Sequence, residues 1–161
     1  MVGLAHGADY SRVDEHGNGL TYTDFVTADG FEETDHTADW ALRVRGSDLA
    51  ALCAQAARGM LTLAGAEPGP RRAGETAVDI RGHDPEDVLV RWLEEILFRL
   101  EMESLVPTEY RLDSDGKTRL KGTVGLAALA RLEKAIKAVT FHGLRIRETP
   151  AGLETTIVFD V

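Results

Sequence analysis

Apolar residues follow two different spacings in the first half of the chain, and together they predict a strand followed by a helix. From Trp40 to Arg45, apolar and polar side chains alternate as they do in a half-buried strand. After Ser47, which is predicted to cap a helix, apolar residues recur every three or four positions. Gly65 is predicted to end this helix.

A second amphipathic helix is predicted from Asp84 onward. Asp84 followed by Pro85 is typical of a helix start, and a wide apolar stripe continues to Leu100. Before it, the proline- and glycine-rich segment 67–74 predicts a loop, and Val78 and Ile80 predict a short strand.

Strands are predicted to dominate the rest of the chain. The sequence Asp-Ser-Asp-Gly at 113–116 predicts a hairpin turn, and the turn at 150–152 predicts another. A bulge near His142-Gly143 would keep the apolar residues of the last hairpin on one face. The alanine-rich stretch 126–135 is interpreted as one or two helical turns. The predicted class is α+β, a single domain with two main helices packed on a largely antiparallel sheet.

The first part of the chain lacks these regular patterns. Residues 1–30 contain several glycines and no sustained apolar period, so they are predicted to form a flexible N-terminal extension. The folded domain is predicted to cover 31–161.

Composition narrows the function classes. No apolar run has the length of a membrane span or a signal peptide, so we expect a cytoplasmic protein without membrane contact. The only cysteine, Cys53, lies in a helical pattern and is expected in the core. A net charge of -9 argues against a general phosphate-binding surface, so contact with RNA is expected only through a protein partner.

One group of basic residues leaves two interpretations open. Arg43, Arg45, Arg145 and Arg147 would form a local basic patch if their strands lie side by side. The alternative is that they are ordinary solvated residues on the outer faces of strands.

The candidate chemistry lies in carboxylates near the two ends of the domain. If the first and last strands are neighbours, Asp39, Asp160 and the terminal carboxylate of Val161 converge at one sheet edge. Their mutual repulsion would favour a bound cation, and oxygen ligands favour Ca²⁺, Mg²⁺ or Mn²⁺. Alternatively, Asp160 is simply solvated, and Asp35 and His36 are ordinary turn residues.

Three segments together resemble the archease family. They are the string Phe31 to Asp39 (FEETDHTAD), the string Lys137 to Leu144 (KAVTFHGL) and the closing Val158-Phe159-Asp160-Val161. The resemblance covers 31–161. One departure is Gly125 to Ala130, where family members usually carry a charged segment.

The resemblance implies a function and a ligand set. It implies an accessory protein that activates an RtcB-type RNA ligase in tRNA splicing and RNA repair, promoting ligase guanylylation and multiple turnover. It also implies a metal site formed by Asp39, Asp160 and Val161, with Ca²⁺ the favoured ion and Mg²⁺ or Mn²⁺ as alternatives.

No catalytic motif accompanies these carboxylates. Neither a nucleophile motif nor a nucleotide-binding loop is present, so we expect a protein without catalytic activity of its own. Two alternatives stay open: a metal-dependent phosphoesterase that uses Asp35, Asp39 and Asp160, and a metal-free, chaperone-like binding module.

Overall fold

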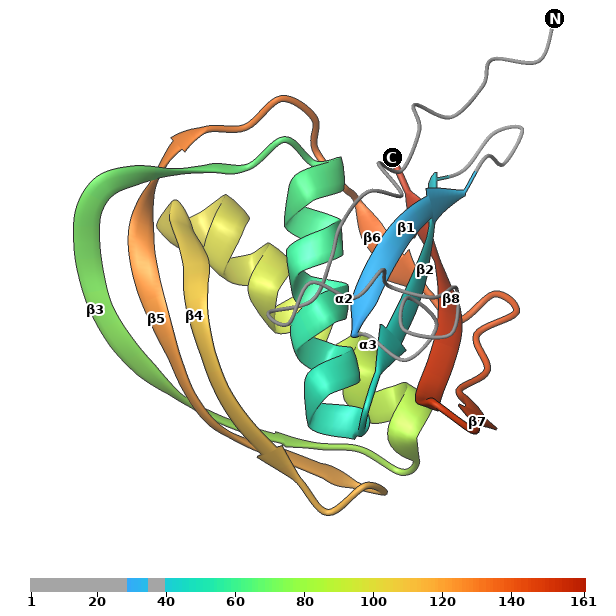
Figure 1. Ribbon diagram of the computed structural model, residues 1–161. Helices are drawn as coiled ribbons and strands as arrows, with labels where there is room; N and C mark the ends of the chain where they lie inside the picture. The colour runs from blue at the N-terminus through green and yellow to red at the C-terminus, as the bar shows by residue number, and fades with distance from the viewer. Residues whose placement is uncertain (1–28, 35–39) are drawn as a thin grey trace, which may run out of the picture.

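The computed structural model describes residues 29–34 and 40–161, in which two antiparallel sheets flank a pair of helices (Figure 1). The five-stranded sheet has the order β1-β2-β8-β6, and β7 also pairs with β8. Its strands are β1 (Gly30–Thr34), β2 (Trp40–Gly46), β6 (Ala138–Thr140), β7 (Arg147–Thr149) and β8 (Gly152–Asp160).

The second sheet is three-stranded and curves around the other side of the helices (Figure 1). Its order is β3-β5-β4, with β3 (Glu67–Arg81), β4 (Leu105–Ser114) and β5 (Arg119–Arg131). The helices are α2 (Leu49–Leu63) and α3 (Pro85–Phe98), and α3 continues into a π-helical turn, η1 (Arg99–Glu103). No helix in residues 29–34 and 40–161 combines the length and apolar character that a bilayer crossing requires.

Side-chain capping begins both helices. The Asp84 carboxylate accepts a hydrogen bond from Asp87 N at 2.8 Å, and Pro85 opens α3, as predicted. The cap of α2 is Asp48, which accepts from Ala51 N at 2.8 Å, so the prediction of Ser47 was wrong by one residue. Gly65, with a φ of +60°, follows the end of α2, as predicted.

The helices and both sheets share one core, which confirms the single-domain α+β class. Trp92 on α3 donates a hydrogen bond from Nε1 to the carbonyl oxygen of Cys53 on α2, at 2.9 Å. Cys53 is fully buried, as predicted, and burial raises the pKa of its thiol well above the ordinary range. The strands, however, form two sheets where the sequence predicted one.

Segment 67–74 is part of a strand, and the predicted loop was wrong. β3 runs from Glu67 to Arg81 and pairs with β5 through several register shifts. Because β3 is an edge strand, Pro68 and Pro70 can be accommodated without breaking a central ladder.

The helical turns predicted for 126–135 were also wrong. Residues up to Arg131 belong to β5, the central strand of its sheet, and Leu126 and Ala127 are buried there. Pairing on both sides with β3 and β4 overrides the helix preference of alanine.

The chain leaves the sheet between β6 and β7, so the predicted bulge near His142-Gly143 was wrong. Leu144 N donates to the carbonyl oxygen of Phe141 at 3.1 Å, which closes a turn at this point. Phe141, one of the apolar residues that the bulge was predicted to keep on the buried face, has an exposed fraction of 58%.

Candidate metal centre at the end of strand β8

The last residues of β8 carry part of the predicted metal site. Phe159 points into the core and is fully buried, whereas Asp160 is exposed. The outward orientation of Asp160 agrees with the alternation of the strand. Val161 follows as a half-buried residue packed against the edge of the core.

Strand pairing brings both ends of the domain to this place. Trp40 of β2 pairs with Phe159, so residue 40 and residue 159 are direct cross-strand neighbours. Asp39 is joined by one peptide bond to Trp40, and Asp160 by one peptide bond to Phe159. Asp39 itself, like Asp35 and His36, lies outside the described residues.

Two lysines lie at the same edge. The main-chain nitrogen of Lys137 donates a hydrogen bond to the main-chain carbonyl oxygen of Asp160 at 2.8 Å. Its side-chain Nζ donates to the main-chain oxygen of Val161 at 2.9 Å. Lys134 Nζ lies 4.5 Å from the centroid of the Trp40 ring, which is a cation–π distance. Neither lysine was predicted to take part in the site, although Lys137 begins the string Lys137 to Leu144.

The donor chemistry of this edge fits a hard cation. A carboxylate at Asp160 and an oxygen at Val161 are the kinds of donor that Ca²⁺ and Mg²⁺ prefer. The Val161 oxygen accepts a hydrogen bond from the Lys137 ammonium at 2.9 Å, so a metal ion bound there would meet a positive charge that is already present. Within 29–34 and 40–161, no three His, Cys, Asp or Glu residues form a metal-sized cluster. A complete site would therefore require Asp39.

The four arginines noted in the sequence lie around one carboxylate on the outer face of the same sheet. Glu154 accepts hydrogen bonds from Arg43 Nη2 and Arg45 Nε, both at 2.9 Å. The hydrogen bond from Arg43 is the main cause that lowers the pKa of Glu154, while partial burial opposes it. Arg145 and Arg147 line a shallow groove of about 130 Å³ with Glu154. The local basic patch is thus formed, and Glu154 is its central counter-ion, which was not predicted from the sequence.

Comparison with known protein families identifies the family of this chain. Residues 31–161 match the model of the archease protein family. The chain belongs to the archease family. This membership confirms the resemblance drawn from its three characteristic segments.

Individual relatives of this archease agree with the family match. Protein archease of Archaeoglobus fulgidus is 31% identical over 133 residues, covering 79% of this chain and 96% of that protein. Protein archease of Methanosarcina barkeri is 29% identical over 141 residues, covering 81% and 95%.

Solved structures share the architecture. The solution structure of Methanobacterium thermoautotrophicum protein 1598 is 29% identical, with a TM-score of 0.63, and covers 82% of this archease and 99% of that chain. The crystal structure of an archease from Thermotoga maritima, described as a possible chaperone, has a TM-score of 0.61 and covers 81% and 96%. At 23% identity the latter likeness concerns the fold alone.

Proposed function

We propose that this archease is a cytoplasmic accessory protein that activates an RtcB-type RNA ligase in tRNA splicing and RNA repair. It promotes guanylylation of the ligase and allows multiple turnover, and it has no catalytic activity of its own. The ligase is its direct partner.

We further propose that activation depends on a divalent ion held by Asp39, Asp160 and Val161, with Ca²⁺ favoured and Mg²⁺ or Mn²⁺ as alternatives. The observation that carries this part is the pairing of Trp40 with Phe159, because each of these residues directly adjoins one of the two aspartates. The ion would offset the repulsion between the carboxylates and hold the end of β8 in one arrangement.

The exposed position of Asp160 also supports a role at a partner surface. Its neighbours Phe159 and Val139 are buried and fix the backbone, while its side chain faces solvent. Substitution of this carboxylate should therefore change function without creating a cavity in the core.

The test is a reconstituted guanylylation assay with purified ligase, labelled GTP and Mn²⁺. Substoichiometric wild-type protein should raise the rate of ligase–GMP formation and support repeated ligation. Asp160→Ala and Asp39→Ala should lose this stimulation. The matched control is Asp113→Ala, an exposed carboxylate on the hairpin of the other sheet, and it should stimulate like wild type.

Three outcomes would contradict the proposal. Equal stimulation by wild type and by both site variants would remove the metal-bearing edge from the mechanism. Phosphoesterase turnover by the isolated chain would favour an enzyme. Failure of wild type to stimulate, together with suppression of client-protein aggregation, would favour the chaperone-like module.

A further inference from the structure

We propose that this archease contacts single-stranded RNA directly, through Arg147 on the sheet face that also carries Asp160 and through Arg145 and Phe141 in the adjoining segment between β6 and β7. The inference rests on the proposed function, since it concerns the RNA substrate of the same ligase. The proposed function brings the protein to RNA only through the ligase. The inference adds a direct contact with RNA, which is weak in the isolated protein.

The first observation is that Arg147 lacks the counter-ion that strand pairing would provide. Arg147 lies opposite Glu154 in the register of β7 and β8. The carboxylate oxygens of Glu154, however, are bound by Arg43 and Arg45 at 2.9 Å each. Glu154 is therefore already neutralised, and in the part of the chain that the structure describes Arg147 is left to bind another anion.

The charge balance of this face is positive, although the whole chain carries a charge of -9. Four arginines gather here, and among residues 29–34 and 40–161 only Glu32 and Glu154 form ion pairs with them. In the described part of the chain, neither Arg145 nor Arg147 has an acidic side chain within ion-pair distance. Both are exposed, and the guanidinium geometry suits the paired oxygens of a phosphate.

The second observation favours nucleic acid over an acidic protein segment. Phe141, with an exposed fraction of 58%, belongs to the loop that leads into Arg145. Arg145 lines both the groove that it shares with Arg147 and Glu154 and a neighbouring pocket lined by Phe141. Proteins bind single-stranded nucleic acid by placing basic side chains against the phosphates and aromatic rings against the bases. Arg145 and Phe141 together provide this combination.

The loop that carries these residues is anchored to α3. The Glu86 carboxylate accepts a hydrogen bond from Ile146 N at 2.9 Å, between Arg145 and Arg147. Asp84, Glu86 and Asp87 also line the pocket beside Phe141. Their negative charge would direct the phosphates to the arginine side and leave a base to stack on Phe141.

The distance between the arginines and Asp160 suits an RNA strand that continues into the active site of the ligase. Glu154, Thr156, Val158 and Asp160 alternate with the buried residues of β8, so they lie on one face. Asp160 lies six positions after Glu154 in the strand, a distance of roughly 20 Å. An extended RNA of a few nucleotides would span the two places.

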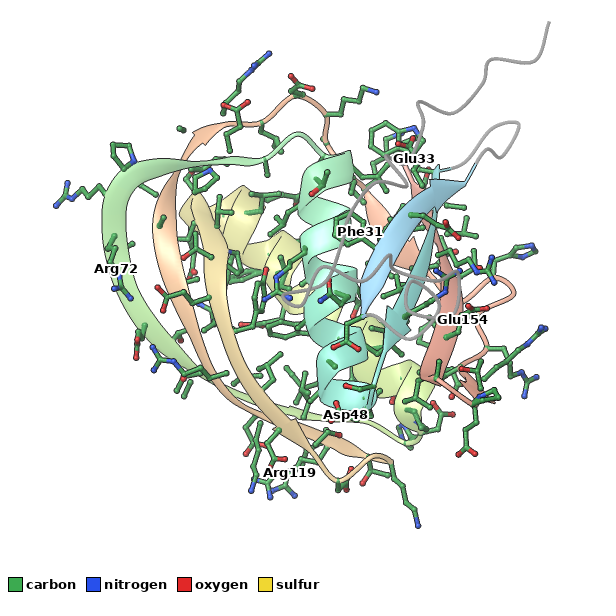
Figure 2. The ribbon with its side chains drawn as sticks, viewed as in Figure 1. Phe31, Glu33, Asp48, Arg72, Arg119 and Glu154 are labelled. Atoms are coloured by element: carbon green, nitrogen blue, oxygen red, sulfur yellow. The ribbon has the colours of Figure 1, made fainter. Side chains whose placement is uncertain are left out.

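The direct test measures binding of a fluorescent single-stranded oligouridine to the full chain at low salt. Arg145→Ala/Arg147→Ala should weaken binding about fivefold or more and reduce the salt slope by about 1.4, as expected for two lost phosphate contacts. Phe141→Ala should weaken binding about fivefold through lost stacking. The matched control, Arg71→Ala/Arg72→Ala, removes the same charge from β3, and Figure 2 shows Arg72 on the opposite side of the molecule from Glu154.

Two outcomes would overturn the inference. One is RNA binding that is unchanged in the Arg145→Ala/Arg147→Ala protein or equally weakened in the control. The other is binding of a polyglutamate peptide as tightly as RNA of equal charge, which would assign the face to an acidic protein.

A separate assay distinguishes this inference from the proposed function. Ligase guanylylation without RNA should be stimulated equally by wild type and by Arg145→Ala/Arg147→Ala, whereas stimulation of RNA joining should fall in the variant. If wild type fails to stimulate guanylylation, the proposed function fails, and the oligouridine measurement still decides the RNA contact.

Discussion

The side chain of Lys137 donates a hydrogen bond to the main-chain oxygen of Val161, at 2.9 Å. The ammonium group thus lies on one of the three proposed ligands of the metal ion. A divalent ion bound to the terminal carboxylate of Val161 would lie close to this ammonium group, and the repulsion between the two cations makes Lys137 a competitor for the site.

This competition predicts opposite effects for two substitutions. Lys137→Met should tighten Ca²⁺ binding about three- to tenfold, because removal of a positive charge lowers the repulsion that the ion experiences. Asp160→Asn should weaken binding, since it removes a charged oxygen ligand. Calorimetric titration with Ca²⁺ and Mn²⁺ measures both. Weaker binding by Lys137→Met, or unchanged binding by Asp160→Asn, would contradict this arrangement.

Extension of the chain beyond Val161 should also impair activation. An added residue replaces the proposed carboxylate ligand with a neutral peptide group, which attracts a divalent ion less strongly. The measurement is ligase guanylylation by proteins with and without a short C-terminal tag, with an N-terminal tag as the control. Full stimulation by the C-terminally tagged protein would show that the terminal carboxylate is dispensable.

Asp87 should make stability depend on pH in the acid range. Hydrogen bonds from the main chain and ring of His83, and then from Arg91, lower the pKa of Asp87 to about 2. The pKa in the unfolded chain is about 3.9, so the stabilisation is present above about pH 4 and is lost as the pH falls towards 2. Urea unfolding should show a smaller loss over this range for Asp87→Asn than for wild type. Asp113→Asn, on an exposed hairpin, should follow the wild-type curve.

Gly122 should be the more sensitive of two glycines with positive φ. It has a φ of +148° in the central strand β5, where an added Cβ would collide with the carbonyl oxygen of Arg111. Gly122→Ala should therefore lower the unfolding free energy by about 2–4 kcal/mol. Gly116, with a φ of +75°, has open space around it, and Gly116→Ala should cost only about 1 kcal/mol. Equal decreases of the unfolding free energy in the two variants, measured by urea unfolding, would show that the structure adjusts to a Cβ at position 122 at little energetic cost.

The sequence alone predicted the features that depend on near neighbours. The start of α3 at Asp84-Pro85 and the end of α2 near Gly65 follow from capping chemistry within one helical turn. The outward position of Asp160 follows from alternation along a single strand. The choice of Ser47 over Asp48 failed because both are good caps and local preference does not separate them.

Contacts between distant segments were decided only by the tertiary structure. Segments 67–74 and 126–131 join a sheet because each pairs with strands far away in the sequence, the first of them through several register shifts. This pairing outweighs their local preferences for loop and helix. Asp160 and Val161 stay predicted ligands, and nothing in the sequence predicted that Lys137 lies on the Val161 oxygen. It also left open whether the four arginines meet. That depends on the register of β2, β7 and β8, which backbone hydrogen bonds across the whole sheet fix together.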